Sequence, residues 1–340
     1  MELSERKRRI LVAIIEKYIA HGEPVGSKTL CQEFSNSVSS ATIRNDMAEL
    51  AALGFLEQPH ASAGRIPSQQ GYRYYVDSLM NKRVLSESEQ KAIKSMLSYR
   101  SGDPEQLLEA ASSVLAQLTK CATIATTLGD DEATISKVEL VTLGQTTAIL
   151  VVVTSKGIIK NRVCRLDYPL TDKLISSFYE VVRSHFIGTA INEVSTVTLQ
   201  SIVASLGDRA LMLSPLIITL AEIIHEISEI DIVLEGQSNL LNIGSTANAQ
   251  ELLEFLSRRE ILKRIVNEQK HRLNVVIGQE NPHKELKNSS VIIARYKIDG
   301  CDAGALGIIG STRIDYAQLI PNIEYLTGLV SSLLSDAIGG

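Results

Sequence analysis

The segment from Pro24 to Tyr75 constrains the fold more than any other part of the chain. Residues 39–53 have a helical period that gathers Ile43, Met47 and Leu50 on one face, which must therefore pack inward. Small and short polar side chains cover the opposite face, with Arg44 on its flank: Ala41, Thr42, Asn45, Ala48, Glu49 and Ala52. A helix with such an outer face can approach another surface closely and form hydrogen bonds there.

Local signals define the ends of this helix. Ser39 or Ser40 can cap its N-terminus, and Gly54 stands where a left-handed residue commonly ends a helix. A shorter helix is expected over 26–34, joined to the second by the turn-forming residues 35–38. Two helices at this spacing predict a helix-turn-helix whose second helix presents its outer face.

A short hairpin is predicted directly after the second helix. Residues 55–58 have strand character, residues 61–65 form a turn that ends in Gly-Arg, and residues 66–67 run back. Ser68 can then cap a further helix. Helix, turn, helix and hairpin together make a winged helix-turn-helix. In such a motif the second helix enters the major groove of DNA, while the hairpin reaches backbone or minor groove.

Charge is unevenly distributed along the chain. Residues 1–83 carry eleven Lys or Arg against nine Asp or Glu, whereas the net charge of all 340 residues is −5. The run Arg6-Lys7-Arg8-Arg9 lies near a helix N-terminus, where positive charges interact unfavourably with the helix dipole. Binding of an anion from outside the protein would offset this cost. The pattern favours a DNA-binding unit on an acidic body. An amphipathic helical pair that contacts protein remains the alternative.

Ten residues are expected to contact DNA. Thr42, Arg44 and Asn45 are assigned to bases or adjacent phosphates, because Asn and Arg pair with purine edges in the major groove. The residues assigned to backbone phosphates are Arg6, Arg9, Ser39 and Ser40. The residues assigned to the wing are Ser62, Gly64 and Arg65.

The remainder predicts an α+β body reached through a helical connector. A capping box at Ser86 begins a helix to about residue 99, and Asp103-Pro104 opens another, so residues 81–122 are assigned to the connector. β-branched runs separated by turn signals then predict strands. The expected elements are strands over 138–143, 147–154 and 158–166, a helix over 171–186, a long helix over 250–269, a hairpin of 291–297 with 304–309, and a terminal helix over 321–338.

Several classes of protein are excluded by what the sequence lacks. The four cysteines form no Cys-x-x-Cys pair, so neither a zinc finger nor a disulfide framework is expected. The sequence has no P-loop, Gly-x-Ser-x-Gly or His-Glu-x-x-His motif, and we expect no enzymatic activity, metal or cofactor. The uncharged runs are too short for a membrane span and the N-terminus lacks a secretion signal, so we expect a cytoplasmic protein.

Three stretches of the sequence resemble one bacterial protein family. They are SSATIRNDMAELAALGFLEQPHASAGRIPSQQGYRYYVD, LVTLGQTTAILVVVTSKG and ALGIIGSTRIDYAQLIPNIEYLTGLVSSLLS. The first is very close to the N-terminal signature of the heat-inducible transcription repressors, the HrcA family. The family's wing usually carries Thr where this chain has Ala61 and Ser68, so one of two hydroxyls is retained.

The resemblance implies both a fold and a function. The implied fold is an α+β multidomain protein with a winged helix-turn-helix over 1–80, the connector over 81–122, a GAF-like domain formed by 123–190 and 233–340, and an inserted dimerisation domain over 191–232. The implied function is negative regulation of heat-shock chaperone operons by a homodimer that binds an inverted-repeat operator in double-stranded DNA. The GroE chaperonin would keep this repressor active, and heat stress would inactivate it.

Two alternatives stay open at the level of sequence. A GAF-like domain could instead sense a small molecule, which would make the protein a ligand-gated winged-helix regulator. The apolar run from Ala210 to Leu220 could form part of a dimer interface, or it could be a buried core helix of one subunit.

Overall fold

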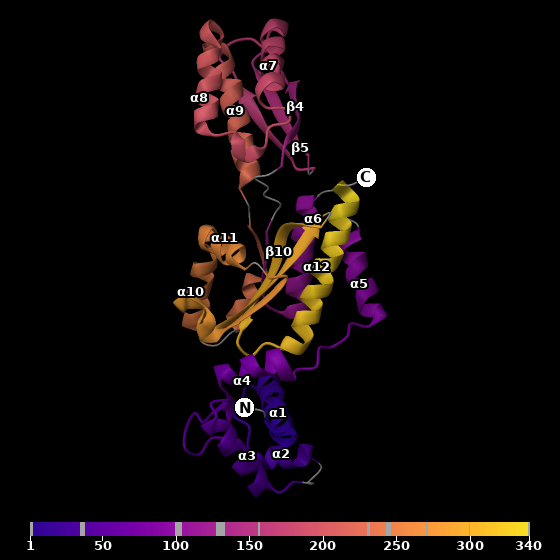
Figure 1. Cartoon of the computed structure of the whole chain (residues 1–340), viewed down its shortest axis with the longest axis vertical. Coiled ribbons are helices and arrows are strands. Elements are labelled where there is room, and N and C mark those ends of the chain that lie inside the picture. Colours follow the sequence, from indigo (N-terminus) through magenta and orange to yellow (C-terminus); the bar gives the residue numbers. More distant parts are fainter. Residues whose placement is uncertain are drawn as a thin grey trace.

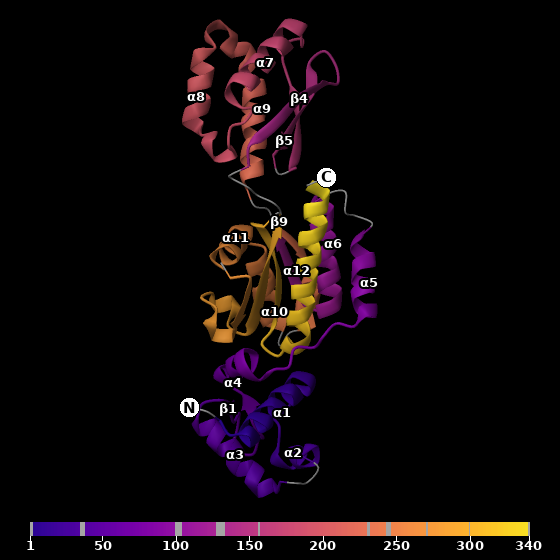
Figure 2. The ribbon, with the colours of Figure 1, turned by 45° about the vertical axis from the view of Figure 1, so that its right-hand side comes forward.

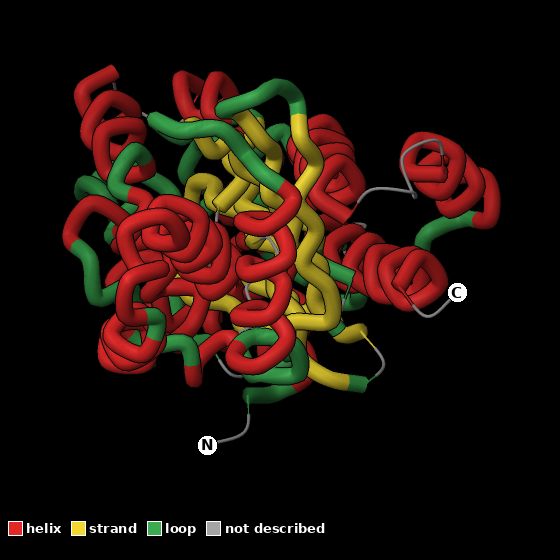
Figure 3. The backbone as a smooth tube through the Cα atoms, turned by 90° about the horizontal axis from the view of Figure 1, so that it is seen from above, coloured by secondary structure: helices red, strands yellow, loops and turns green. Residues whose placement is uncertain are grey.

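The computed structural model divides the chain into three units along one long axis (Figure 1). An N-terminal unit (3–80) lies at one end, a central unit (87–126 with 232–338) in the middle, and a distal unit (133–229) at the other end, in the same order after a 45° turn (Figure 2). Along that axis, strands run through the middle with helices on either side (Figure 3). The structure describes residues 3–34, 38–98, 104–126, 133–155, 157–229, 232–242, 246–269, 271–298 and 300–338.

Local signals build the N-terminal unit as predicted. Ser39 accepts a hydrogen bond from the Thr42 N–H (3.1 Å), and Gly54 follows the second helix of the motif with a left-handed φ of 85°. The elements are α1 (Glu5–His21), α2 (Ser27–Glu33), α3 (Ser40–Ala52), β1 (Leu56–Glu57), β2 (Ile66–Pro67), α4 (Gln69–Tyr74) and a π-helical turn (Tyr75–Leu79). The predicted winged helix-turn-helix is confirmed.

A five-stranded antiparallel sheet forms the middle of the central unit. Its strand order is β7-β3-β10-β9-β8, so the two strands that flank the distal unit in sequence, β3 and β7, are paired neighbours. The strands are β3 (Ala122–Thr126), β7 (Ile232–Glu235), β8 (Leu273–Ile277), β9 (Ser289–Ile298) and β10 (Cys301–Ser311). The helices are α5 (Glu87–Ser98), α6 (Pro104–Thr119), α10 (Thr246–Leu256), α11 (Arg259–Glu268) and α12 (Tyr316–Ile338).

Alternating side chains give this sheet two apolar faces. In β9, Ile292 and Ala294 belong to the core that also contains residues of α6 and α12. Val291 and Ile293 belong to a second core with residues of α10 and α11. Helices therefore cover both faces of the sheet, and the predicted α+β class is confirmed.

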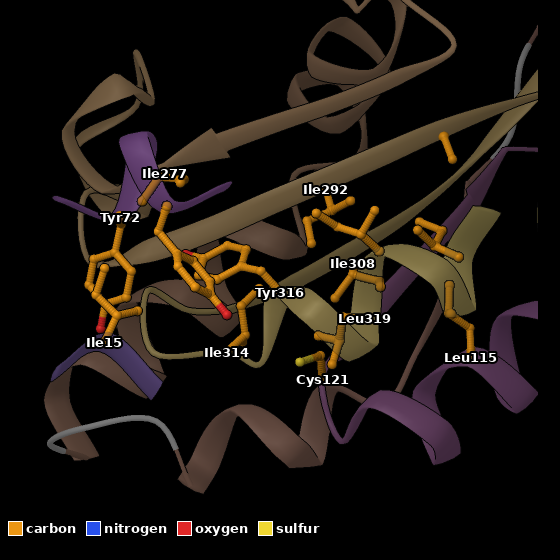
Figure 4. Close-up of a cluster of buried hydrophobic side chains, with 14 of the residues drawn as sticks. Ile15, Tyr72, Leu115, Cys121, Ile277, Ile292, Ile308, Ile314, Tyr316 and Leu319 are labelled. Carbon is orange, nitrogen blue, oxygen red and sulfur yellow. The ribbon is translucent and has the colours of Figure 1, made fainter. Parts of the chain in front are cut away.

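The core of α6 and α12 continues into the N-terminal unit. Figure 4 shows Ile15 and Tyr72 of that unit beside Tyr316, the first residue of α12, and Ile314, which lies two residues before it. The ring centroids of Tyr72 and Tyr316 are 6.0 Å apart. Because the two units share one hydrophobic core, separating them would expose apolar side chains to water.

The helices predicted as a connector belong to the central unit. Leu97 of α5 and Leu107 of α6 are fully buried in its core, and α6 packs on β3 and α12. The prediction of a connector over 81–122 was therefore wrong, because the apolar faces of α5 and α6 cover the body. Only residues 80–86 lie between the last turn of the N-terminal unit and α5.

The distal unit has a sheet and a core of its own. The three-stranded antiparallel sheet β4-β5-β6 packs against a helical layer (Figure 1). The elements are β4 (Ile135–Thr142), β5 (Thr147–Thr154), β6 (Ile159–Arg165), α7 (Asp172–His185), α8 (Thr196–Ser205) and α9 (Ala210–Ser228). The predicted insertion over 191–232 began too late. The strands predicted within 123–190 form a sheet separate from the central one. The sequence did not reveal this, because a β-branched run predicts a strand but not the strand with which it pairs.

The apolar run in α9 forms part of the distal core. Leu213, Leu216 and Leu220 are almost fully buried, whereas Leu211 and Ile218 are 86% and 56% exposed. Among the described residues, one helix, Gly207–Ser228, is long and apolar enough to cross a membrane by length and composition alone. In this fold that helix is packed between α8 and the sheet of the distal unit.

Two predicted helices had incorrect ends. The helix expected over 250–269 is two helices, because α10 ends at Leu256 and α11 begins at Arg259. Helix α12 begins at Tyr316 and contains Pro321. Because proline has no N–H, the Ala317 carbonyl lacks its usual helical donor and accepts instead from the Arg83 N–H (3.0 Å). The segment 80–86, which follows the N-terminal unit, is thereby tied to the central unit.

Candidate nucleic-acid interface

Helix α3 exposes the face that its sequence predicts. Ile43, Met47 and Leu50 are at most 4% exposed and pack inside the N-terminal unit. Arg44 and Asn45 are exposed, as are Ala41, Ala48 and Glu49, and Thr42 is half-buried. The helix therefore presents a donor-rich polar face on the outside of the molecule.

Hydroxyl groups hold the N-terminus of α3 in place. Ser40 Oγ lies 3.0 Å from Ser27 Oγ on α2, and Ser39 Oγ lies 2.9 Å from Thr42 Oγ1. These contacts leave each hydroxyl oxygen with further capacity to accept or donate a hydrogen bond. Ser39 and Ser40 thus lie at the helix end where a phosphate oxygen is favourably bound.

The wing is a short hairpin that is hydrogen-bonded to Val25, just before α2, and whose turn is closed by the side chain of one glutamine. Gln58 Nε2 donates to the carbonyls of Ala61 (2.9 Å) and Ala63 (3.1 Å), and its Oε1 accepts from Arg65 Nη1. The backbone of Arg65 also exchanges two 2.9 Å hydrogen bonds with Val25. These bonds fix the height at which the wing stands beside α3.

Gly64 has a structural reason to lack a side chain. A Cβ built there would lie 2.4 Å from the Val25 carbonyl oxygen, closer than real contacts allow. Gly64 therefore allows the wing to approach the residues before α2. Its predicted place in the DNA interface rests on its backbone only.

A cleft of about 700 Å³ lies between α3 and the wing. It brings together five of the ten predicted residues: Arg44, Asn45, Ser62, Gly64 and Arg65. Lys28 of α2 also lines it and was missed by sequence reasoning. The signal was available, since Lys28 opposes the dipole in the first turn of its helix as the run at residues 6–9 does. The described residues that line the cleft include three cations and no carboxylate.

The basic run of α1 lies outside this cleft. Arg6 donates to both carboxylate oxygens of Asp46 on α3 (2.7 and 3.1 Å), and Lys7 pairs with Glu49. The guanidinium carbon of Arg9 lies 5.1 Å from the centroid of the Phe34 ring. Arg6 and Arg9, which the sequence predicts as phosphate contacts, therefore each have a partner within the N-terminal unit that the sequence alone does not reveal.

Two models of one family cover most of the chain. The model for the "Winged helix-turn-helix transcription repressor, HrcA DNA-binding" matches residues 2–78, and the model for the "HrcA protein C terminal domain" matches residues 105–320. The chain belongs to the HrcA family. The heat-inducible transcription repressors HrcA of Acetivibrio thermocellus and Alkaliphilus metalliredigens are 33% and 34% identical to it, over 100% of this chain and 98% and 99% of theirs.

HrcA membership defines the role of the N-terminal unit in outline. Relatives across the whole length are transcription repressors, which is a non-enzymatic role, and the family's winged helix binds DNA. A solved structure described as "Crystal structure of a hypothetical protein at 2.2 A resolution" has the same fold, with a TM-score of 0.70 at 25% identity. That match covers 99% of this chain and 100% of the other.

Proposed function

We propose that two copies of this repressor bind an inverted-repeat operator upstream of heat-shock chaperone operons and so block transcription. The observation that carries the proposal is the cleft lined by Lys28, Arg44 and Arg65 beside the exposed face of α3. With α3 in the major groove, Arg44 and Asn45 would hydrogen-bond purine edges. The groups that would contact the backbone are Lys28, Ser39, Ser40, Ser62 and Arg65.

A homodimer would match the symmetry of such an operator, because two N-terminal units related by a two-fold axis can each bind one half of an inverted repeat. The distal unit offers a surface for the second copy. Val141, Ile149 and Val163 stand opposite one another on successive strands, on the sheet face that alternates with the buried one. Val141 and Val163 are 50% and 51% exposed. Val153 and Ile159 form a second apolar row on this face.

The distal unit also holds most of the exposed large apolar side chains. Nine of the twelve found among the described residues lie there: Val141, Leu143, Ile159, Val163, Ile187, Val197, Leu211, Met212 and Ile218. Concentrated apolar exposure of this kind marks interaction surfaces in soluble proteins. We therefore assign the dimer contact to the distal unit, at the end of the molecule opposite the DNA-binding unit (Figure 1).

We also propose that the GroE chaperonin maintains this repressor in the bacterial cytoplasm and at the nucleoid, and that heat stress inactivates it by diverting the chaperonin to misfolded clients. The supporting feature is a fold that depends on distant parts of the chain, because residues near positions 15 and 72 share a core with residues near 316. A protein near its stability threshold changes its active fraction several-fold for a small change in free energy.

The first test is fluorescence anisotropy of the purified protein on a duplex carrying the inverted repeat, compared with a scrambled duplex across a salt series. We expect tight binding that prefers the inverted repeat, weakens with salt and is lost in Arg44→Ala. Equal affinity for both duplexes, unchanged by added chaperonin and ATP, would contradict the proposal.

The chaperonin is tested with a heat pulse. We expect operator affinity to fall after the pulse and to return when chaperonin and ATP are supplied. Retention of full affinity after heating without chaperonin would contradict this part of the proposal and leave the DNA-binding part intact.

A further inference from the structure

Two ion pairs join the first turn of α1 to the recognition helix α3. Arg6 Nε and Nη2 donate to Asp46 Oδ2 (2.7 Å) and Oδ1 (3.1 Å), and Lys7 Nζ lies 2.5 Å from Glu49 Oε2. The two donors are adjacent on α1, and the two acceptors are three residues apart, on neighbouring turns of α3. Two points of attachment along one helix restrict both its position and its rotation about its own axis.

The Asp46 carboxylate is the stronger of the two attachments. Its side chain is 4% exposed and lies on the inward side of α3 with Ile43 and Met47. A buried carboxylate needs a charged partner with good geometry, and the planar fork of arginine satisfies both oxygens at once. The hydrogen bonds that Arg6 donates to Asp46, together with the charge of that carboxylate, raise the pKa of the Arg6 guanidinium, so Arg6 remains a cation.

The second pair acts on the outer face of the same helix. Glu49 is exposed on the side of α3 that carries Asn45, where its carboxylate would repel a DNA phosphate. Lys7 neutralises that charge, and its own side chain is only 22% exposed. Both cations are therefore committed to carboxylates within the protein.

We propose that Arg6 is a positioning residue. Through Asp46 it fixes the rotation of α3 so that Arg44 and Asn45 point at the base edges, and it does not contact a phosphate. Bidentate recognition of a base tolerates little displacement, so a rotation of the helix would weaken operator binding with the phosphate contacts intact. This inference rests on the proposed function.

Salt dependence separates the two roles. The logarithm of the binding constant falls linearly with the logarithm of the salt concentration. Removal of one phosphate contact makes this negative slope shallower by about 0.9, or by about 1.8 for a dimer in which both half-sites are affected. We expect Arg6→Ala to weaken operator binding about ten-fold or more with the slope unchanged. Lys28→Ala, the matched removal of a cation from the cleft, is expected to reduce the slope. A reduced slope or undiminished affinity in Arg6→Ala would overturn the proposal.

Two milder variants serve in case Arg6→Ala unfolds the N-terminal unit. Asp46→Asn keeps the size of the side chain and frees the Arg6 cation, so a phosphate-binding Arg6 would bind DNA as well or better, whereas a positioning Arg6 binds the operator less tightly. Arg6→Lys keeps the charge and removes the fork, so we expect an intermediate loss of affinity. Operator affinity equal to wild type in both variants would overturn the proposal.

The scrambled duplex keeps this test separate from the test of function. If the wild-type protein binds both duplexes equally even when chaperonin and ATP are added, the proposed function fails. Arg6 is then judged on the scrambled duplex alone, where a phosphate contact lowers the slope and a positioning residue changes neither the slope nor the affinity. Thermal melting followed by circular dichroism confirms that each variant is folded at the assay temperature.

Discussion

Arg73 of α4 binds both carboxylate oxygens of Glu280, 207 residues further along the chain: Nε lies 2.9 Å from Oε1, and Nη2 lies 2.5 Å from Oε2. The same Nη2 donates to the Val275 carbonyl at the edge of the central sheet (2.5 Å). Beside this pair, the Gln69 side-chain oxygen accepts from the Gln279 N–H (2.8 Å). The orientation of the DNA-binding unit on the central unit is therefore fixed by polar bonds as well as by the shared core.

Removing the charge of Glu280 should loosen this junction. We expect Glu280→Gln to lower the free energy of unfolding by about 1 kcal/mol, since the two side chains are about 30% exposed and partly screened by water. Thermal melts measure the effect. Asp77→Asn is the matched control, because Asp77 makes a single 3.2 Å contact with the same arginine and is 54% exposed. An equal loss in both variants would contradict the assignment.

The same junction should respond to acid. Burial alone would raise the pKa of Glu280, but hydrogen bonds from Arg73 and the Ile277 N–H outweigh it and hold that pKa below its usual value. A lowered folded-state pKa stabilises the protein above the unfolded pKa of about 4.3, and the stabilisation is lost as pH falls through the folded value. We expect the difference in melting temperature between wild type and Glu280→Gln to be largest near pH 6 and to close toward pH 3.

Two tyrosines that touch each other should respond oppositely to loss of a hydroxyl. Tyr72 Oη is buried without a hydrogen-bond partner among the described residues. Tyr316 Oη, in contrast, lies 2.6 Å from Ser290 Oγ and 2.9 Å from the Thr312 carbonyl. We expect Tyr72→Phe to raise the free energy of unfolding by about 1 kcal/mol and Tyr316→Phe to lower it by a similar amount. Denaturant titration of both variants checks the signs.

Two glycines that line the cleft between α3 and the wing should differ sharply in their tolerance of alanine. Gly64→Ala would press a Cβ against the Val25 carbonyl, so the wing must move away and operator affinity should fall about ten-fold. Gly26→Ala meets open space, since no neighbouring atom lies within 4 Å of the place that its Cβ would take, and should fold normally. Anisotropy on the operator duplex and thermal melts measure the two effects. Wild-type affinity in Gly64→Ala would show that the height of the wing is unimportant.

A charge on the outer face of the distal sheet should dissociate the proposed dimer. Val163→Glu places a carboxylate in the row formed with Val141 and Ile149, where a second copy would bury it without a partner. Sedimentation velocity is expected to give a monomer. Val84→Glu is the control, because Val84 is 86% exposed but lies between the N-terminal and central units. A dimer that survives Val163→Glu would move the contact to another surface.

Local features of the fold were predictable from the chain alone. The apolar period of α3, the cap at Ser39 and the left-handed Gly54 depend on residues only a few positions apart, so their physics is contained in a short window of sequence. The same holds for the wing, whose turn residues are recognisable by type. These elements define the winged helix-turn-helix and the exposed face of its second helix.

Pairing between distant segments was not predictable in the same way. A β-branched run shows that residues 147–154 form a strand, but strand partners are chosen by the packing of the whole chain, and so the distal unit was assigned too few residues. The connector prediction was wrong for the same reason, because an amphipathic helix does not reveal which surface its apolar face will cover.

The types and order of the residues predict which groups could contact DNA, whereas the packing of the helices gives some of those groups partners within the protein. Arg6 and Arg44 are both helical arginines, yet one is held by a carboxylate 40 residues away and the other lines an open cleft with Lys28. Electrostatic pairing depends on distance in space and not along the chain. The sequence therefore shows where each positive charge lies along the chain, whereas the carboxylate with which it pairs is determined only by the packing of the helices.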